Sequence, residues 1–468
     1  MLALPQPRAF LRRLAVIGVV AAVFGAGLDV TMDHIGDHSR PWLAVVGVAQ
    51  DPCVPRAVPL GPRIRGQFDV DSSVLRTASG SYAVPAGSVL DAASARACAA
   101  TADGADRHWL YSGLIPGTTR SQQAMAVRAL LDLKLAVQPN GAVVAGWAPD
   151  WEYAWPRDSA WVAVALADTG HVGLARRILQ FLQRVQATDG TWESRYELDG
   201  SGPVRDGRPA ELDAVGWVPW AVWSWAEAAG PTSLTRAELA ELWPMVARAA
   251  DADESSIDDD GLPVPSMDYW EDDVEATLGT AAPLLAGLRA AADLATDVGP
   301  SAAVEGHRWA AAADKLATAI TTRFGATGYQ RTSSAGSGAD AAVTFLGPPF
   351  ALPDAKVRAA ADAAQRALRV PNGGLKPGAD WQSTPDVAWT AETAVFALFD
   401  AATGQSHAAS GLLSWLAAHR TRVGSLPEQV DAAGKPASVA PLSWTDAVTL
   451  LSLIAEEGHL QTIPLPQG

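Results

Sequence analysis

The chain of 468 residues carries a formal net charge of -16, with a pI near 4.9. Since this charge would repel nucleic acid and anionic membrane surfaces, neither is expected as the main partner. Hydrophobic residues make up 49% of the chain, enough for one large domain or a few small ones. The 18 Trp residues outnumber both Tyr and Phe. Most are expected to fill the core, but flat indole faces also suit sugar rings.

Residues 1–30 have the pattern of an export signal. Arg8, Arg12 and Arg13 precede an uncharged apolar run, Leu14 to Leu28. The run is shorter than the roughly 20 apolar residues of a membrane-spanning helix, so a cleaved signal and an uncleaved anchor both stay open. In either case the Arg cluster stays inside the cell. We therefore expect a protein that is secreted or anchored to the outside of the cell membrane.

Residues 31–117 are rich in Pro and Gly and contain short β-branched runs. Two of these runs, Gln67–Val70 and Tyr82–Val84, predict strands within an irregular N-terminal extension. Cys53 and Cys98 both fall in this region, and an oxidising compartment would allow one disulfide between them. Two free thiols are the alternative. No cysteine and histidine spacing suggests a metal site.

Residues 118–468 are dominated by Ala- and Leu-rich segments with apolar residues three and four positions apart. This pattern predicts consecutive helices and an all-α domain, arranged as helical hairpins in a closed ring or as an open solenoid. The expected helices are Ser121–Val137, Ser159–Ala167, Val172–Gln186, Ala210–Ala228, Arg236–Asp251, Val274–Thr296, Ser301–Phe324, Asp354–Ala367, Pro385–Ala402, Ser406–His419 and Ser443–Glu456.

Two glutamates in loop-like stretches between helices are the first candidates for chemistry. Glu271 lies in Asp268-Tyr-Trp-Glu-Asp272, and Glu428 lies in Ser425-Leu-Pro-Glu-Gln429. A loop can aim such a side chain into a cleft. Cleavage of a glycosidic bond needs one carboxyl group that donates a proton to the leaving oxygen and another that activates a water. The pair therefore points to a glycoside hydrolase.

A third segment, Trp155-Pro-Arg157-Asp158, supplies a fork-shaped donor and an acceptor beside an aromatic ring. These groups suit sugar hydroxyls and sugar faces. Alone, the segment could equally be a helix start with a favourable acid in its first turn, and the two glutamates could be surface acids. Their joint occurrence favours a sugar site. The absence of a Gly-x-Ser-x-Gly elbow and of a phosphate loop disfavours serine hydrolases and nucleotide enzymes.

Four segments in this order resemble glycoside hydrolase family 15, the glucoamylase group, between Leu131 and Ile454. They are Gln138–Gly146 followed by Glu152–Ser159, Arg205–Gly207 with Glu211–Trp217, Asp268–Asp272, and Gly424–Gln429 with Leu442–Trp444. The resemblance implies an (α/α)6 barrel, inverting hydrolysis of α-glucosidic bonds from the non-reducing end of oligosaccharides or polysaccharides, and no obligatory cofactor.

The resemblance also implies individual roles. Glu271 would be the general acid and Glu428 the general base. Asp268 and Asp272 would lie on either side of the acid and would also be substrate-binding residues. The neighbouring indole of Trp270 and the flanking carboxylates disfavour ionisation of Glu271, which would keep its proton available. Glu428, by contrast, must be ionised to accept a proton from water.

For the substrate, the resemblance implies that Arg157 and Asp158 bind hydroxyls of the terminal sugar, with Trp155 and Trp270 as walls of the pocket. The chain departs from the family at Lys376, where an Arg is common, because Lys lacks the bidentate fork. No starch-binding module is evident, so small soluble oligosaccharides are favoured over raw starch. Trehalose, a cell-envelope glycan and a non-catalytic surface carbohydrate-binding protein are the alternatives.

Overall fold

The computed structural model describes residues 43–45, 56–58, 66–77, 92–271, 275–381 and 384–465. The expected export segment 1–30, Cys53, the predicted strand Tyr82–Val84 and Asp272 lie outside these ranges. Within the ranges, the helices are all too short or too polar to cross a membrane.

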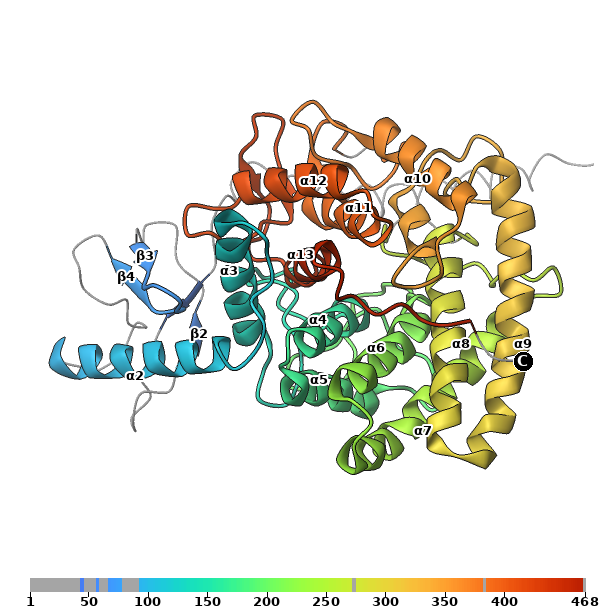
Figure 1. Ribbon diagram of the computed structural model, residues 1–468, viewed down its shortest axis with the longest axis horizontal. Coiled ribbons are helices and arrows are strands. Elements are labelled where there is room, and N and C mark those ends of the chain that lie inside the picture. Colours follow the sequence, from blue (N-terminus) through green and yellow to red (C-terminus); the bar gives the residue numbers. More distant parts are fainter. Residues whose placement is uncertain are drawn as a thin grey trace, which may run out of the picture.

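The helical part is a closed ring of inner helices surrounded by outer ones (Figure 1). Each inner helix contacts the next, and the last returns to the first. The ring is therefore closed rather than an open solenoid, which confirms the predicted (α/α)6 barrel. The inner members are α4 (Pro156–Asp168), α6 (Ala214–Ala229), α8 (Leu278–Val298), the short 3-10 helix η3 (Ala341–Leu346), α11 (Thr390–Ala402) and α13 (Ser443–Glu456).

The outer helices cover the joints between inner helices. For example, α5 contacts both α4 and α6, and α7 contacts both α6 and α8. The outer members are α3 (Arg120–Ala136), α5 (Val172–Val185), α7 (Ser233–Ser256), α9 (Pro300–Ala319), α10 (Ala355–Leu368) and α12 (Ser406–Ala418). Helix α9 continues into a π turn, η1 (Ile320–Phe324), and a 3-10 turn, η2 (Gly325–Thr327).

Hydrophobic patterning decides which helices lie inside. Helix α6 is apolar on nearly all sides and is buried from Ala214 to Trp225, as expected for a helix surrounded by others. Helix α5 buries a single stripe that includes Ile178 and Leu182 and exposes its charged face. Where α6 crosses α8, a Cβ atom at Gly216 would lie 2.1 Å from the carbonyl oxygen of Pro283. Glycine is therefore needed for this close approach.

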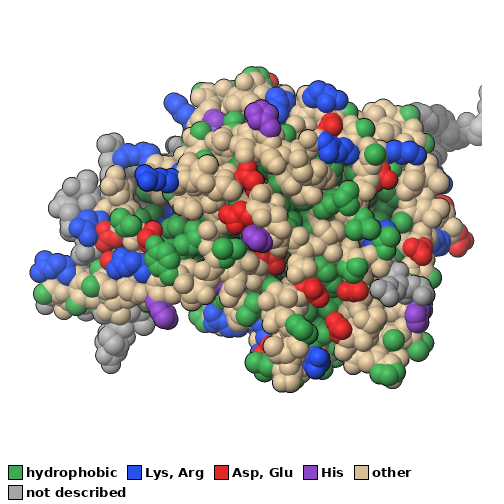
Figure 2. All heavy atoms as spheres, in the orientation of Figure 1, with side chains coloured by type: hydrophobic (Ala, Val, Ile, Leu, Met, Phe, Trp, Pro, Cys, Tyr) green, Lys and Arg blue, Asp and Glu red, His purple; other side chains and the backbone are tan. Residues whose placement is uncertain are grey.

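Within the described ranges, the N-terminal extension forms two antiparallel hairpins and helix α2. The hairpins pair β1 (Leu43–Val45) with β2 (Arg56–Val58) and β3 (Gly66–Phe68) with β4 (Leu75–Thr77). Strand β3 overlaps the predicted run at Gln67 and Phe68. Helix α2 (Ala92–Leu110) projects with the β3–β4 hairpin to one side of the barrel (Figure 1). Lys and Arg side chains gather at this end of the face shown in Figure 2.

Helix α2 was not predicted, because its apolar residues are mostly alanines interrupted by polar residues and Gly104, without a regular apolar stripe. Alanine nevertheless has the highest helix propensity, which accounts for the helix. Cys98 lies on α2, where it is buried and disulfide-bonded.

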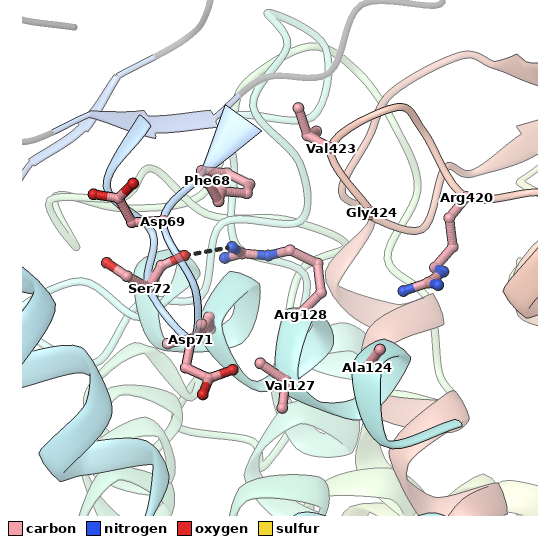
Figure 3. Close-up of a pocket in the computed structure, with 11 residues that line it drawn as sticks. Phe68, Asp69, Asp71, Ser72, Ala124, Val127, Arg128, Arg420, Val423 and Gly424 are labelled. Carbon is pink, nitrogen blue, oxygen red and sulfur yellow. Dashed lines mark hydrogen bonds between the residues drawn. The ribbon is translucent and has the colours of Figure 1, made fainter. Parts of the chain in front are cut away.

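Arg128 of α3 joins the extension to the barrel. Its guanidinium donates to the carbonyl oxygen of Ser72 at 3.1 Å and to Oγ of Ser73 at 3.0 Å, and it lies 4.0 Å from the ring centre of Phe68. A hollow of about 160 Å³ lies beside this contact and is drawn in Figure 3. Its lining includes Arg420 and Gly424, but none of the predicted site residues. This hollow is therefore separate from the candidate active site.

Candidate active site

The predicted site residues lie at or just before the N-termini of inner helices. Arg157 and Asp158 are in the first turn of α4, and Glu271 precedes α8. Glu428 directly precedes β6 (Gln429–Val430), which pairs with β5 (Ala388–Trp389) and β7 (Pro436–Ala437) in a small sheet. Strand β5 leads straight into α11. Site residues that are far apart in the sequence thus lie in the segments that lead into the inner helices.

Backbone pairing ties these loops together. The segment before α6 forms a parallel bridge between Glu211 and Met267 of the loop before α8. The N–H of Ser443, at the start of α13, donates to the carbonyl oxygen of Ala145 at 2.8 Å. The N–H of Thr390, at the start of α11, donates to the carbonyl oxygen of Glu428 at 2.9 Å.

Arg157 is the central cation of the site. Its Nη1 atom forms ion pairs with Glu211 and, at 3.0 Å, with Asp213, while its Nε atom lies 3.9 Å from Asp158. The guanidinium also lies 5.5 Å from the ring centre of Trp444. All of these side chains are buried. Arg157 thus holds together acids from α4 and from the loop before α6.

Burial is the main influence on the acids around Arg157. It raises the pKa of Glu211 to about 7 and that of Asp158 to about 6, against the attraction of Arg157. Burial also raises the pKa of Asp213. These carboxyl groups therefore hold protons more tightly than exposed ones do.

Glu428 is 9% exposed and is held on both of its oxygens. Ser438 donates to Oε2, and the indole Nε1 of Trp151 donates to Oε1 at 3.2 Å. Burial raises the pKa of Glu428 to about 7, while these two hydrogen bonds lower it and the charge of Asp158 raises it further. Ser438 itself has a left-handed backbone with φ of 59°, which is rare for a residue with a side chain.

Glu271 sits on a tight turn whose geometry Asp268 fixes. The carbonyl oxygen of Asp268 accepts from the N–H of Glu271 at 2.9 Å, and its Oδ1 accepts from the N–H of Trp270 at 2.9 Å. Arg331 grips both carboxylate oxygens, at 2.9 and 3.1 Å. Glu271 itself has φ of 57°, an uncommon value that concentrates at functional sites.

The structure corrects the expected role of Asp268. Its side chain is 0% exposed and its oxygens are taken by Arg331, Thr277 and the backbone. It supports the turn from within and has no free surface for a sugar. Asp272, the other expected neighbour of Glu271, lies outside the described residues.

The surroundings of Glu271 also differ from expectation. Its carboxylate forms an ion pair with Arg208, and the two side chains are 28% and 34% exposed. A paired cation favours the ionised carboxylate, which opposes the expected protonated form. The sequence pattern did not reveal this contact, because Arg208 lies in a different loop, before α6.

The two expected wall residues are both largely buried. The guanidinium of Arg195 lies over Trp155, 5.1 Å from the centre of the indole ring. The guanidinium of Arg331 lies 3.7 Å from the ring centre of Trp270, which also packs edge-on against Trp381. The Nε1 atoms of Trp155, Trp270 and Trp444 are buried without a hydrogen-bond partner among the described residues. Such donors are available to a ligand or a water.

The sequence patterns do not reveal several neighbours of the predicted site residues: Trp151, Arg208, Arg331, Asp340, Glu392 and Ser438. Most are polar residues in loops without a distinctive motif. Glu392 carries a signal that could have found it, since it is an acid in the first turn of the otherwise buried and mainly apolar helix α11. An acid at such a position needs a partner or a function.

We expect Arg157→Ala to lower the free energy of unfolding by about 3–5 kcal/mol, because it leaves buried Glu211 and Asp213 without their cation. Urea unfolding followed by Trp fluorescence measures this. Arg157→Lys keeps the charge without the fork and should lose less. An unchanged unfolding curve for Arg157→Ala would show that these acids do not depend on Arg157.

We expect the melting temperature to be several degrees lower at pH 8.5 than at pH 5.5. Asp158, Glu211 and Glu428 have pKa values of about 6, 7 and 7 in the folded chain, above the ordinary values of about 4 that apply after unfolding. The stability that these groups contribute is fully present at pH values below the pKa of the unfolded chain. It is lost as the pH rises through the pKa values of the folded chain. Differential scanning calorimetry at both pH values tests this, and a higher melting temperature at pH 8.5 would contradict it.

No family model matches the chain. Among curated proteins, an uncharacterized glycosyl hydrolase of Methanocaldococcus jannaschii is 28% identical over 97 residues, which is 20% of this chain. The chain spans 15% of the length of that relative.

Solved structures match over most of the chain. A glycosidase variant in complex with glucose is 22% identical, with a TM-score of 0.59, and covers 75% of this chain and 99% of its own. A bacterial glucoamylase complexed with acarbose is 17% identical, with a TM-score of 0.61, and covers 80% and 60%. The family 15 glucoamylase from Hypocrea jecorina is 18% identical, with a TM-score of 0.58, and covers 73% and 72%.

The fold is therefore that of the glucoamylase-like glycosidases. This agrees with the resemblance to family 15 that the sequence motifs carry. Within the described ranges, His, Cys, Asp and Glu side chains do not form a group of three or more that could hold a metal ion.

Proposed function

We propose that the protein is an inverting, exo-acting α-glycosidase that hydrolyses α-glucosidic bonds of small oligosaccharides or glucans. The observation that carries the proposal is the arrangement of Glu428, Glu271 and the Arg157–Asp158 pair around the inner-helix N-termini of a glucoamylase-like barrel. Fold alone does not define an activity. In this proposal, the carboxyl groups of Glu271 and Glu428 and the ion-paired Arg157 supply the chemistry.

In the proposed mechanism, Glu271 protonates the leaving oxygen while Glu428 removes a proton from a water on the opposite face of the sugar. Glu428 suits the base role because it titrates near neutral pH and is held by Ser438 and Trp151. Glu271 is paired with Arg208 in the free protein. We propose that the bound substrate separates this pair, so that Glu271 takes up the proton that it later donates.

The terminal sugar would lie against Asp158 and the unpaired donors near it. The Nε of Arg157 and the Nε1 of Trp155 and Trp444 are buried without hydrogen-bond partners among the described residues. Sugar hydroxyls would satisfy them, and leaving buried polar groups unpaired is costly. This supports a site that recognises one sugar residue closely, as an exo-acting enzyme requires.

We expect Asp158→Asn to lower kcat/KM roughly 10²-fold, since it weakens a charge-assisted hydrogen bond to the substrate in a buried site. Steady-state kinetics on the best α-linked disaccharide measures this. The melting temperature serves as the control for folding. An unchanged kcat/KM would show that the Trp155–Asp158 segment only begins helix α4 and does not bind the substrate.

A second candidate is hydrolysis of trehalose or of a cell-envelope glycan on the same barrel. It is favoured by Lys376, whose Nζ donates to the carbonyl oxygen of Ala379 at 3.0 Å, a bond within its own loop. The expected fork for a second glucose unit is absent there. A glycan outside the cell would also fit the proposed export of the chain through residues 1–30. Fractionation of cells that express the protein would test this export.

Product analysis on maltose, isomaltose, nigerose, kojibiose and trehalose separates these candidates. Release of glucose from one or more of the first four supports the proposed function. Cleavage of trehalose alone supports the second candidate. Binding of sugars without any cleavage would support a non-catalytic carbohydrate-binding protein and overturn both.

A further inference from the structure

The first turn of α11 carries a buried acid that the proposed mechanism does not use. Glu392 is 3% exposed, and it follows Thr390, whose N–H and hydroxyl both bond the carbonyl oxygen of Glu428. Its neighbours on α11 include buried Ala391 and Val395. A carboxyl group among such side chains lowers stability unless its oxygens are hydrogen-bonded.

Glu392 faces charged groups from several elements of the site. The carboxylates of Glu428 and Asp340 and the guanidinium of Arg157 all act on it electrostatically, and it acts in turn on Tyr269. These groups come from the loop before β6, the segment before η3, helix α4 and the loop before α8. Glu392 therefore lies within electrostatic reach of groups from four different elements around the predicted site.

One oxygen of Glu392 is unused. Its Oε2 atom is enclosed and has no hydrogen-bond partner among the described residues. Tyr269, a possible local donor, bonds Oδ1 of Asp340 at 2.5 Å instead. A buried carboxyl oxygen without a partner is rare in folded proteins and calls for a ligand or an ordered water.

We propose that Glu392 is a further substrate-binding residue of this site and that its Oε2 atom forms a hydrogen bond with a hydroxyl of the terminal sugar. This inference rests on the proposed function. A site built to bond a hydroxyl group rejects an analogue that lacks this group. Glu392 would therefore help the site to distinguish a sugar from an apolar or deoxygenated ligand.

The protonation state of Glu392 fits this role. Burial raises its pKa to about 8, the charges of Glu428 and Asp340 raise it too, and Arg157 lowers it. Arg157 is already shared with Glu211 and Asp213. At pH 7 Glu392 is therefore mostly neutral, and a neutral carboxyl group can both donate to and accept from a hydroxyl. Above pH 8 it becomes a second negative charge near Glu428.

Two variants separate hydrogen bonding from charge. Glu392→Gln keeps the size and the hydrogen-bonding capacity but cannot ionise, and Glu392→Leu removes both. Asp400→Asn is the matched control, since Asp400 is on the same helix, is also 3% exposed and bonds Gln365 away from the site. D-glucose and its 2-, 3-, 4- and 6-deoxy analogues are the probes, titrated by calorimetry between pH 6 and pH 9.

We expect Glu392→Leu to raise the Kd for D-glucose roughly 10-fold, the equivalent of one buried hydrogen bond. One deoxy analogue should bind the wild-type protein more weakly than D-glucose does. The same analogue and D-glucose should bind Glu392→Leu equally well. In wild type and Asp400→Asn, affinity should fall above pH 8, and in Glu392→Gln this fall should disappear. If Glu392→Leu does not fold, the pH profile of Glu392→Gln still decides.

Wild-type affinity for D-glucose in Glu392→Leu, or an unchanged alkaline fall in Glu392→Gln, would overturn the inference while leaving the proposed function intact. Wild-type protein that neither binds D-glucose nor cleaves any α-linked disaccharide would overturn the proposed function, and this inference with it.

Discussion

Replacing Glu271 with Gln is expected to reduce kcat roughly 10² to 10⁴-fold on α-linked disaccharides, whose leaving group is a sugar hydroxyl. The amide keeps the shape of the side chain but cannot donate the proton that the leaving oxygen needs. Substrate affinity should change by a small factor, because the lost interaction belongs to the transition state. The turn that Asp268 and Arg331 build does not depend on the Glu271 carboxylate.

The control is an α-glucosyl fluoride, whose leaving group departs with little help from an acid. Glu271→Gln should retain much more of its activity on this substrate. Glu275→Gln is a matched variant in the same loop, exposed and outside the site, and should behave as wild type. Retention of more than half of the wild-type kcat on disaccharides by Glu271→Gln would remove Glu271 from the acid role.

Glu428→Ala is expected to be crippled to a similar degree on every substrate, including the fluoride, because no group remains to deprotonate the attacking water. Added azide should restore activity, since the anion can occupy the vacated space and attack C1 without losing a proton. The bond from C1 to the leaving oxygen breaks while Glu271 protonates that oxygen, and the product is the β-glycosyl azide.

The pH dependence of the wild-type kcat/KM should reflect the ionisation of Glu428. Because Glu428 must be ionised and its pKa is about 7, activity should fall as pH drops below 7. An α-glycosyl azide, or an alanine variant with near-normal hydrolysis, would contradict the assignment of Glu428 as the base.

Much of the fold could be predicted from the sequence because the inner and outer helices have the apolar periodicity that their positions require. Helix α13 spans Ser443–Glu456, as predicted. Helix α11 begins at Thr390 rather than Pro385, because the residues just before it pair as strand β5. The inner element η3 was missed, since a 3-10 helix of six residues is too short to show a period.

The site could be predicted only in part, for a physical reason. Motif residues such as Arg157 and Glu428 are recognisable from their local sequence. Their partners are set by tertiary contacts between distant segments: Arg331 lies 63 residues from Asp268, and Trp151 lies 277 residues from Glu428. The ion pair between Arg208 and Glu271 likewise joins two loops. Single-sequence patterns carry no information about such pairs.

The stereochemistry of the first product tests the central claim most directly. If Glu271 donates the proton and Glu428 activates a water on the opposite face, the carboxyl groups stand roughly 6.5 to 9.5 Å apart when substrate is bound, and the reaction inverts the anomeric centre. Proton NMR of the reaction on the best α-linked disaccharide, recorded before mutarotation, should then show β-glucose as the first product. An initial α-anomer would contradict the assignment of these two residues as acid and base.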